Sequence, residues 1–406
     1  MSLGQLTPKE PIPSQNNPLG RLIAYLKDPL TGSNIRKIRL KQALLLSRSQ
    51  GFGTPDGHQI MPFEMYRTQI ESKLLLRVIN TPTQSPQERT SAIDRAMTSN
   101  NQISHILVMP HWSENPQELC EWFDQTQALI QRTGSSETQL VMLDYYAPTC
   151  SPHFSALAHV DRYIKRQTLT DLSEYENEYR SGFAFADFVA DTWGFELEDW
   201  HFGSKIPAAH ANKLVSGWNL GITPRYEQIL KWTKRVPIPW SLRRIDIHQR
   251  IGGLGKPGQK QEWYQFSRAK GIEALDPLKS KYRMSTIGRV SRKKYFLELC
   301  SSKVVFSPFG WGEVCFRDYE AIACGALLVK PDMSHVTTEP NIYIANETYI
   351  PVAWDYSDAA DKVEECLSNP HKAKQIIANA RRVLSEYYTS AHFIDTLGRC
   401  LGISSH

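Results

Sequence analysis

The sequence predicts an α/β protein in which two doubly wound, Rossmann-like domains face each other across a cleft, followed by C-terminal helices. The chain has 406 residues, of which 41% are hydrophobic, so it can bury two cores of ordinary domain size. In both halves, short apolar runs alternate with helical stretches, which is typical of parallel sheets covered on both faces. A proline-rich stretch at residues 235–240 separates the halves.

The first half is expected to contain strands at residues 73–80, 104–110, 139–148 and 161–167. Helices are expected at residues 85–97, 115–134 and 151–160, preceded by a short basic helix at 34–47. Ser85 is a predicted N-cap, because Glu88 stands three residues later in the capping-box pattern. Residues 171–230 are rich in acidic and aromatic side chains, and their hydrophobic residues follow neither the helical nor the strand period.

The second half repeats the alternation. Strands are expected at residues 243–250, 281–290, 303–310 and 326–332. Helices are expected at residues 262–271, at 292–302, from near Glu313 and, as an amphipathic pair, over 370–400. Two consecutive domains of this kind bind ligands between them, at the carboxyl ends of their strands.

We therefore divide the chain into four parts. They are an N-terminal arm with the basic helix (1–60), a first Rossmann-like domain (61–235), a second Rossmann-like domain (236–385) and a C-terminal helix that is able to cross back (386–406).

The formal net charge of +5 is unevenly distributed along the chain. Residues 1–50 carry eight Lys and Arg against two acids, and residues 231–295 carry seventeen against four, a local charge of +13. A concentration of one sign raises the local concentration of an oppositely charged ligand, so residues 231–295 indicate an anion site. The alternative is a solvated basic surface that is balanced by acidic neighbours.

Several classes of protein do not fit the composition. No apolar run reaches the roughly 20 residues of a membrane-spanning helix, and residues 1–20 lack the apolar core of a signal peptide. Seven scattered cysteines without C-x-x-C spacing argue against a disulfide framework and against a zinc site. We expect a cytoplasmic protein.

Residues 304–332 carry the strongest functional signal. An apolar run ends in a turn that contains Gly310 and Gly312 and leads directly into a helix. Glycines let the backbone approach a ligand closely, and a helix start offers unpaired N–H groups and a partial positive charge, which suits phosphate. The turn lacks the lysine of a Walker loop and the full dinucleotide fingerprint.

One face of the expected helix carries four reactive side chains: Glu313, Arg317, Glu320 and Cys324. In one interpretation this face meets the cleft, where the carboxylates accept hydrogen bonds from sugar hydroxyls and Arg317 binds a phosphate through two N–H groups. In the other interpretation it is the solvent face of an ordinary amphipathic helix, stabilised by ion pairs along its surface.

Residues 304–356 resemble the donor-binding half of nucleotide-sugar glycosyltransferases of the GT-B fold, which consists of two Rossmann-like domains. The pattern S-P-x-G-x-G, followed by R-x-x-E-A, is shared with exostosin-like and bacterial polysaccharide transferases. The resemblance implies that Glu320 binds the ribose hydroxyls of the donor. It also implies a glutamate eight positions earlier that contacts the donor sugar; Gly312 holds that position, and Glu313 stands one residue late.

The basic segment then gains a role, because the leaving nucleotide diphosphate carries two or more charges that cations must neutralise. The residues expected to bind the donor are Arg250, Arg289, Gly310, Gly312, Arg317, Glu320 and Lys330. GT-B enzymes usually achieve this neutralisation without a metal, and the sequence contains no D-x-D triplet. We therefore expect no metal and no cofactor other than the nucleotide-sugar itself.

Acidic side chains at strand ends are candidates for the chemical step, because proton transfer or nucleophilic attack needs a carboxylate or a histidine at the reacting atoms. We expect Asp246 and Asp144 there, with Glu313 beside the donor sugar. Further candidates are His111, Glu114 and His248. The resemblance extends to retaining transferases of the sugar acid Kdo, which implies a carboxylate nucleophile, here Asp246, and a CMP-linked donor.

The leading hypothesis is a glycosyltransferase that acts on a glycan or lipid-linked saccharide in cell-surface polysaccharide or lipopolysaccharide synthesis. A nucleotide-sugar epimerase of the same fold is the alternative enzyme; it needs two acids and a histidine around one sugar and no acceptor. A nucleic-acid-binding protein would explain the basic segment, but that segment lacks aromatic platforms and a recognition motif. Residues 36–41, beside a run of leucines, either rest on an anionic membrane or pack on their own domain.

Overall fold

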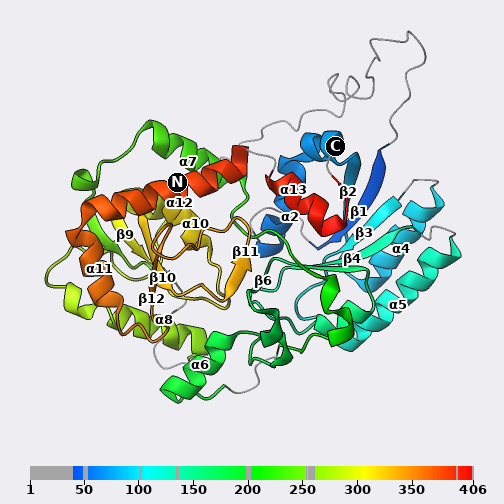
Figure 1. The fold of residues 1–406 in the computed structure, drawn as a ribbon, viewed down its shortest axis with the longest axis horizontal. Coiled ribbons are helices and arrows are strands. Elements are labelled where there is room, and N and C mark those ends of the chain that lie inside the picture. Colours follow the sequence, from blue (N-terminus) through cyan, green and yellow to red (C-terminus); the bar gives the residue numbers. More distant parts are fainter. Residues whose placement is uncertain are drawn as a thin grey trace, which may run out of the picture.

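The computed structural model contains two parallel sheets that lie side by side with helices around them (Figure 1). This arrangement confirms the predicted α/β class with two doubly wound domains. The structure describes residues 40–48, 54–99, 103–133, 137–197, 203–252, 254, 261–389 and 392–404.

The first sheet has the strand order β2-β1-β3-β4-β5-β7, and all of its neighbouring strands are parallel. Its strands are β1 (Lys41–Ser47), β2 (Leu76–Pro82), β3 (Ile103–Val108), β4 (Gln139–Asp144), β5 (Arg162–Lys165) and β7 (Leu214–Ser216). The chain places β2 on one side of β1 and β3 on the other, so the strand order reverses at β1. The described residues that follow β1 and β3 therefore flank this reversal at the carboxyl edge of the sheet, which is the usual ligand position.

The strand β1 corrects the helix expected at residues 34–47. Ala43 and Leu45 pack into the core on one face of the sheet, while Leu44 and Leu46 pack into the core on the other. A strand buried on both faces has a continuous apolar run, which periodicity alone does not distinguish from a buried helix. Residues 34–39 of the expected helix lie outside the described residues.

Helices cover both faces of the first sheet. One face carries α2 (Pro55–Met65), α3 (Arg67–Lys73) and α13 (His392–Leu401), and the other carries α4 (Pro86–Thr98) and α5 (Pro116–Arg132). The predicted cap of α4 is confirmed, because the Ser85 hydroxyl accepts a hydrogen bond from the Glu88 N–H at 3.2 Å. The helix expected at 151–160 is only the short 3₁₀ helix η1 (Phe154–Ala158), in which i→i+3 bonds replace the α-helical ones.

The second sheet has the order β12-β10-β9-β8 and is also parallel. Its strands are β8 (Ile245–His248), β9 (Ser302–Phe306), β10 (Leu327–Pro331) and β12 (Ile350–Val352). The helices in its core are α6 (Ala184–Trp193), α7 (Pro224–Arg235), α8 (Trp263–Glu273), α9 (Arg292–Cys300), α10 (Phe316–Ala323), α11 (Ala359–Ser368) and α12 (Pro370–Thr389). The strand expected at residues 281–290 does not form; Met284 makes a single bridge to Ile247, and most side chains around it are exposed.

The second core begins earlier in the chain than the expected boundary at residues 235–236. Tyr226 and Leu230 of α7 belong to this core, and the Thr233 hydroxyl donates to the Ala323 carbonyl of α10 at 2.7 Å. The apolar stripe of α7 therefore faces the second domain. The chain later returns to the first domain, where Phe393 and Leu397 of α13 pack beneath the sheet.

A two-stranded antiparallel ribbon joins the domains. The strand β6 (Gln167–Leu169), which follows β5, pairs with β11 (Val336–Thr338) of the second half. Asn219 strengthens this junction, because its Nδ2 donates to Gln167 Oε1 at 2.6 Å and to Thr338 Oγ1 at 3.0 Å.

Glu313 links the two domains inside their interface. The residue is 1% exposed and precedes α10 of the second domain. Its carboxylate accepts hydrogen bonds from the Thr149 N–H at 3.1 Å, from the Thr149 hydroxyl, and from Gln167 Nε2 at 2.8 Å. A buried carboxylate is tolerated when its oxygens are satisfied, and here the other domain supplies the donors.

We expect the substitution Glu313→Ala to lower the free energy of unfolding by about 3 kcal/mol, because it leaves the buried donors of Thr149 without an acceptor and removes one of the two acceptors of the Gln167 amide. Urea unfolding followed by tryptophan fluorescence measures the change. The control is Glu347→Ala, since Glu347 is exposed on the same domain. Equal unfolding midpoints for the two variants would contradict the role given to Glu313.

Candidate functional site

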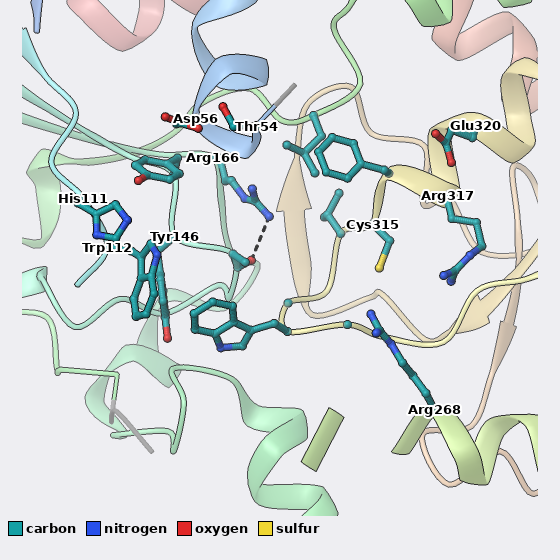
Figure 2. A pocket seen from close by; sticks show the side chains of 18 of the residues that line it. Thr54, Asp56, His111, Trp112, Tyr146, Arg166, Arg268, Cys315, Arg317 and Glu320 are labelled. Atoms are coloured by element: carbon teal, nitrogen blue, oxygen red, sulfur yellow. Dashed lines mark hydrogen bonds between the residues drawn. The ribbon is translucent and has the colours of Figure 1, made fainter. Parts of the chain in front are cut away.

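A cavity of about 540 Å³ lies between the two domains (Figure 2). The polar and aromatic residues that line it from the first domain are Thr54, Asp56, His111, Trp112, Tyr145, Tyr146 and Arg166. Those from the second domain are Arg268, Tyr295, Trp311, Cys315, Phe316, Arg317 and Glu320, together with Gly310 and Gly312.

The wall formed by the first domain follows from the strand order of its sheet. Thr54 and Asp56 lie at the start of α2, after β1, and His111 and Trp112 follow β3. These are the two loops that diverge where the order reverses. The Thr54 side chain caps α2 by accepting the Gly57 N–H at 3.2 Å, so the Asp56 carboxylate stands in the first turn of a capped helix.

The glycine turn between β9 and α10 forms the opposite wall. A methyl group at Gly312 would overlap the carbonyl of Ala147 in the first domain, and a Cβ at Gly310 would lie 2.8 Å from the Arg268 guanidinium. The intervening Trp311 packs edge-to-face on Trp112, with ring centroids 4.8 Å apart. Gly312 is therefore required because the turn is pressed against the backbone of the first domain, whereas a side chain at Gly310 would displace the end of Arg268.

The helix α10 begins later than expected. Its first residue is Phe316 and its N-cap is Cys315, so Glu313 lies in the turn before it. The prediction that Glu313 shares a helix face with Arg317 and Glu320 is therefore wrong, because Glu313 is not part of the helix. The Asp318 carboxylate accepts the Cys315 N–H at 3.0 Å and already occupies part of the helix N-terminus.

Arg317 and Glu320 do line the cavity, as the sequence predicts. Glu320 accepts a hydrogen bond from the Tyr295 hydroxyl at 2.8 Å, and burial raises the pKa of its carboxyl against the opposing effects of Tyr295 and Arg317. Arg317 donates to the Ser307 hydroxyl at 3.3 Å, while its Nε has no hydrogen-bond partner among the described residues. Figure 2 shows both side chains projecting from one helix on the same side of the cavity.

Arg268 is a cavity residue that we did not single out in the sequence. It lies on α8, and its guanidinium donates to the Phe309 carbonyl at 3.2 Å and to the Gly252 carbonyl at 2.8 Å. Both acceptors are neutral, so the positive charge of Arg268 is not paired by them. Its position within the basic segment 231–295 was the only signal available.

A smaller cavity of about 310 Å³ shares Tyr295 and Arg317 with the first. Arg250 and Arg289 line it, together with Arg292. Arg250 is held by Glu298, at 2.5 Å and 2.9 Å, so a structural ion pair already compensates its charge. Arg289 is exposed and has no ion-pair partner within 4.0 Å among the described residues.

Lys330 does not reach either cavity. It is fully buried, with its ammonium 3.2 Å from the Asp318 carboxylate and 4.9 Å from the centre of the Phe309 ring. We read its role as the counter-charge of Asp318, because an unpaired buried carboxylate is costly.

The expected catalytic acids lie outside the cavity lining. Asp246 is the second residue of β8, near the amino end of the strand, so the expectation that it faces the cleft is wrong; it pairs with Lys303 at 2.7 Å. Asp144 does end β4, but it is buried in a network with Tyr163 at 2.6 Å and Lys165 at 3.9 Å. Burial raises its pKa, yet these partners outweigh that effect and lower it. Glu313 is buried in the interface described above.

Of the other candidates, only His111 lines the cavity. Burial is the main cause that lowers its pKa, so the imidazole is neutral near pH 7. Glu114 forms an ion pair with Arg89 at 2.5 Å, and His248 is fully buried with its pKa lowered to about 3 by burial and by Arg317 and Arg250.

The described residues contain no group of three or more His, Cys, Asp or Glu side chains arranged to hold a metal ion. None of the described helices is both long enough and apolar enough to cross a membrane.

Comparison with known proteins gives one family match. Residues 240–398 match the model of a family described as glycosyl transferase-like, and this range contains Arg268, the glycine turn and α10. No curated protein matches the chain.

Solved structures with a similar course of the chain include three enzymes of sugar transfer or synthesis. A glycosyltransferase from Rickettsia africae is 10% identical, with a TM-score of 0.49 over 89% of this chain and 97% of that one. An α,α-trehalose-phosphate synthase from Burkholderia xenovorans is 9% identical, with a TM-score of 0.49 over 89% and 100% of the two chains. The catalytic domain of starch synthase IV from Arabidopsis thaliana is 9% identical, with a TM-score of 0.46 over 89% and 99%.

Proposed function

We propose that the protein is a glycosyltransferase that moves a sugar from a nucleotide-sugar donor to an acceptor hydroxyl. The observation that carries this proposal is the cavity wall of the second domain, where Glu320 stands beside Arg317 and Arg268 across the glycine turn. A carboxylate suits the hydroxyls of a ribose, and guanidinium groups suit phosphate, because each offers the matching hydrogen-bond pattern. The family match over residues 240–398 supports the same assignment.

The donor would lie along the second domain. Glu320 accepts hydrogen bonds from the ribose, and Arg317 and Arg268 neutralise the diphosphate as the bond to the sugar breaks. The two cavities share Arg317 and Tyr295. The smaller cavity therefore offers space for the nucleoside next to the phosphates, along the same wall of the second domain.

The acceptor would lie against the first domain. Asp56 is the carboxylate of this wall, and it takes the proton of the acceptor hydroxyl as that oxygen attacks the anomeric carbon. His111 stands beside it. The Nδ1 atom of His111 lies 2.7 Å from the Ser113 hydroxyl and 3.4 Å from the Ser113 N–H. In this proposal Nδ1 accepts from Ser113, and the Nε2–H of the neutral ring donates a hydrogen bond to a sugar hydroxyl.

The finer proposals concern the substrates and the setting. A glycan or lipid-linked saccharide of cell-surface polysaccharide synthesis remains the proposed acceptor, in a cytoplasmic enzyme that contacts the membrane at most peripherally. A CMP-Kdo donor is the narrowest form of the proposal, but it needs a nucleophile other than Asp246, which lies outside the cavity lining.

A nucleotide-sugar epimerase is the second candidate, and one observation favours it. The cavity contains the residue types such an enzyme needs, two carboxylates and a histidine, in Asp56, Glu320 and His111. Incubating the donor without an acceptor separates the two activities, because an epimerase converts the sugar while it stays attached to the nucleotide.

The substitution Glu320→Gln is expected to weaken binding of the donor nucleotide by about tenfold or more, since it removes a charged acceptor of hydroxyl hydrogen bonds. A thermal-shift screen with UDP, GDP, CMP, TDP and ADP first identifies the nucleotide, and calorimetry then compares the variants. Glu365→Gln is the control, because Glu365 is an exposed residue of α11. If no nucleotide shifts the transition and Glu320→Gln transfers sugar normally, the donor site is misassigned.

The substitution Asp56→Asn is expected to lower kcat by about a hundredfold or more while nucleotide affinity stays within twofold, because general-base catalysis is lost and the donor wall is untouched. Steady-state kinetics and calorimetry on one preparation measure both quantities. Asp94→Asn, on the exposed surface of α4, is the control. A parallel loss of nucleotide affinity would place Asp56 at the donor instead.

We also propose that transfer needs no metal, because Arg268 and Arg317 supply positive charge where the leaving group departs. Treatment with EDTA followed by desalting is expected to change the transfer rate by less than about twofold, since arginine remains protonated at any assay pH. Restoration of a lost rate by added Mg²⁺ or Mn²⁺ would disprove the proposal.

A further inference from the structure

Arg166 is a charged residue of the first domain that neither the fold nor the donor wall accounts for. It stands between β5 and β6 and is 2% exposed, yet it lines the cavity. Figure 2 shows its guanidinium in the middle of the cavity, between the side chains of the first domain and those of Arg268 and Arg317.

The hydrogen bonds of Arg166 are few and neutral. One of its terminal nitrogens donates to the Ala147 carbonyl at 3.3 Å, and its Nε has no partner among the described residues. No described carboxylate lies within 4.0 Å of it; Glu313 is an electrostatic neighbour, but its oxygens are engaged by Thr149 and Gln167. Burial lowers the pKa of Arg166, although an arginine in a protein keeps its proton. A buried positive charge therefore faces the cavity without an ion pair.

The surroundings of Arg166 indicate what would compensate this charge. The electrostatic neighbours of its guanidinium include Cys315, the N-cap of α10, so it reaches across the interface to the region where Arg317 and Arg268 also project. Three guanidinium groups from two domains thus surround one space. Phosphate is the group that suits them, because its oxygens accept paired N–H bonds from several arginines at once.

We propose that Arg166 binds a phosphate group of a ligand held between the domains, so that the first domain contributes directly to anion binding. This inference rests on the proposed function only for the origin of the phosphate, which is either the diphosphate of the donor or a phosphate carried by the acceptor. In both cases residues of both domains bind the same ligand.

The variant Arg166→Gln in the full chain tests the proposal. Calorimetry with inorganic pyrophosphate, with the nucleoside diphosphate found by the screen, and with glucose 6-phosphate as a simple phosphorylated sugar is expected to show at least one affinity reduced about tenfold or more. The matched control Arg132→Gln removes an exposed arginine of the same domain and should change none of them. Arg166→Lys should restore only part of the loss, because an ammonium cannot make the paired contact.

The pattern of losses identifies the source of the phosphate. A reduced affinity for the nucleoside diphosphate assigns Arg166 to the donor, whereas a loss confined to glucose 6-phosphate assigns it to the acceptor. Dependence of pyrophosphate binding on Arg166 in a protein that binds no nucleotide would support this inference while the proposed function fails.

Stability provides a second readout. Removing an uncompensated buried charge is expected to leave the unfolding midpoint of the ligand-free protein unchanged or higher, while the upward shift caused by each probe whose affinity depends on Arg166 is lost. Unchanged affinities for all three probes, or a lowered midpoint combined with unchanged affinities, would overturn the proposal and give Arg166 a purely structural role.

Discussion

The contact between the glycine turn and the first domain determines where the cavity lies. Gly312 lies so close to the Ala147 carbonyl that a methyl group would overlap it, and the next residue, Glu313, accepts hydrogen bonds from Thr149 and Gln167. Two adjacent residues thus fix the end of β9 against the carboxyl edge of the first sheet. The remaining space is bounded by the loops after β1 and β3 on one side and by α10 on the other. The side chains assigned a role in substrate binding line that space.

The same contact explains how the basic segment is used. Arg243 is buried and donates to the carbonyls of Ser302 and Cys324, and Arg250 is committed to Glu298, so part of the charge at residues 231–295 stabilises the second domain. Arg268 instead faces the cavity between the domains. Arg243, Arg250 and Arg268 are therefore engaged inside the protein or face the cleft, where the phosphates of a duplex do not reach them.

The alternation of strands and helices, the cap at Ser85 and the positions of Arg317 and Glu320 could be predicted because each depends on local pattern. Glu313 was assigned to the wrong environment because the helix starts at Phe316, and a shift of three residues turns a side chain from the cleft into the interface. Asp246 was placed at the cleft because the sequence does not show where β8 begins and ends; the residue lies near the amino end of that strand, away from the cleft. Asp56 could not be predicted because the strand before it, β1, is expected as a helix, so no strand end is expected near it. Arg166 directly follows β5, but only the strand order shows that this edge of the sheet meets the cavity.

The charged side chains around the cavity indicate which kind of ligand it binds. Arg166, Arg268 and Arg317 donate to carbonyl or hydroxyl oxygens and to no described carboxylate within 4.0 Å, in contrast to Arg250 with Glu298. Asp56 and Glu320 are the carboxylates among the described lining residues, so the arginines outnumber them. Because like charges repel strongly when they are removed from water, the three arginines repel one another across the cavity. An anion bound among them relieves that repulsion.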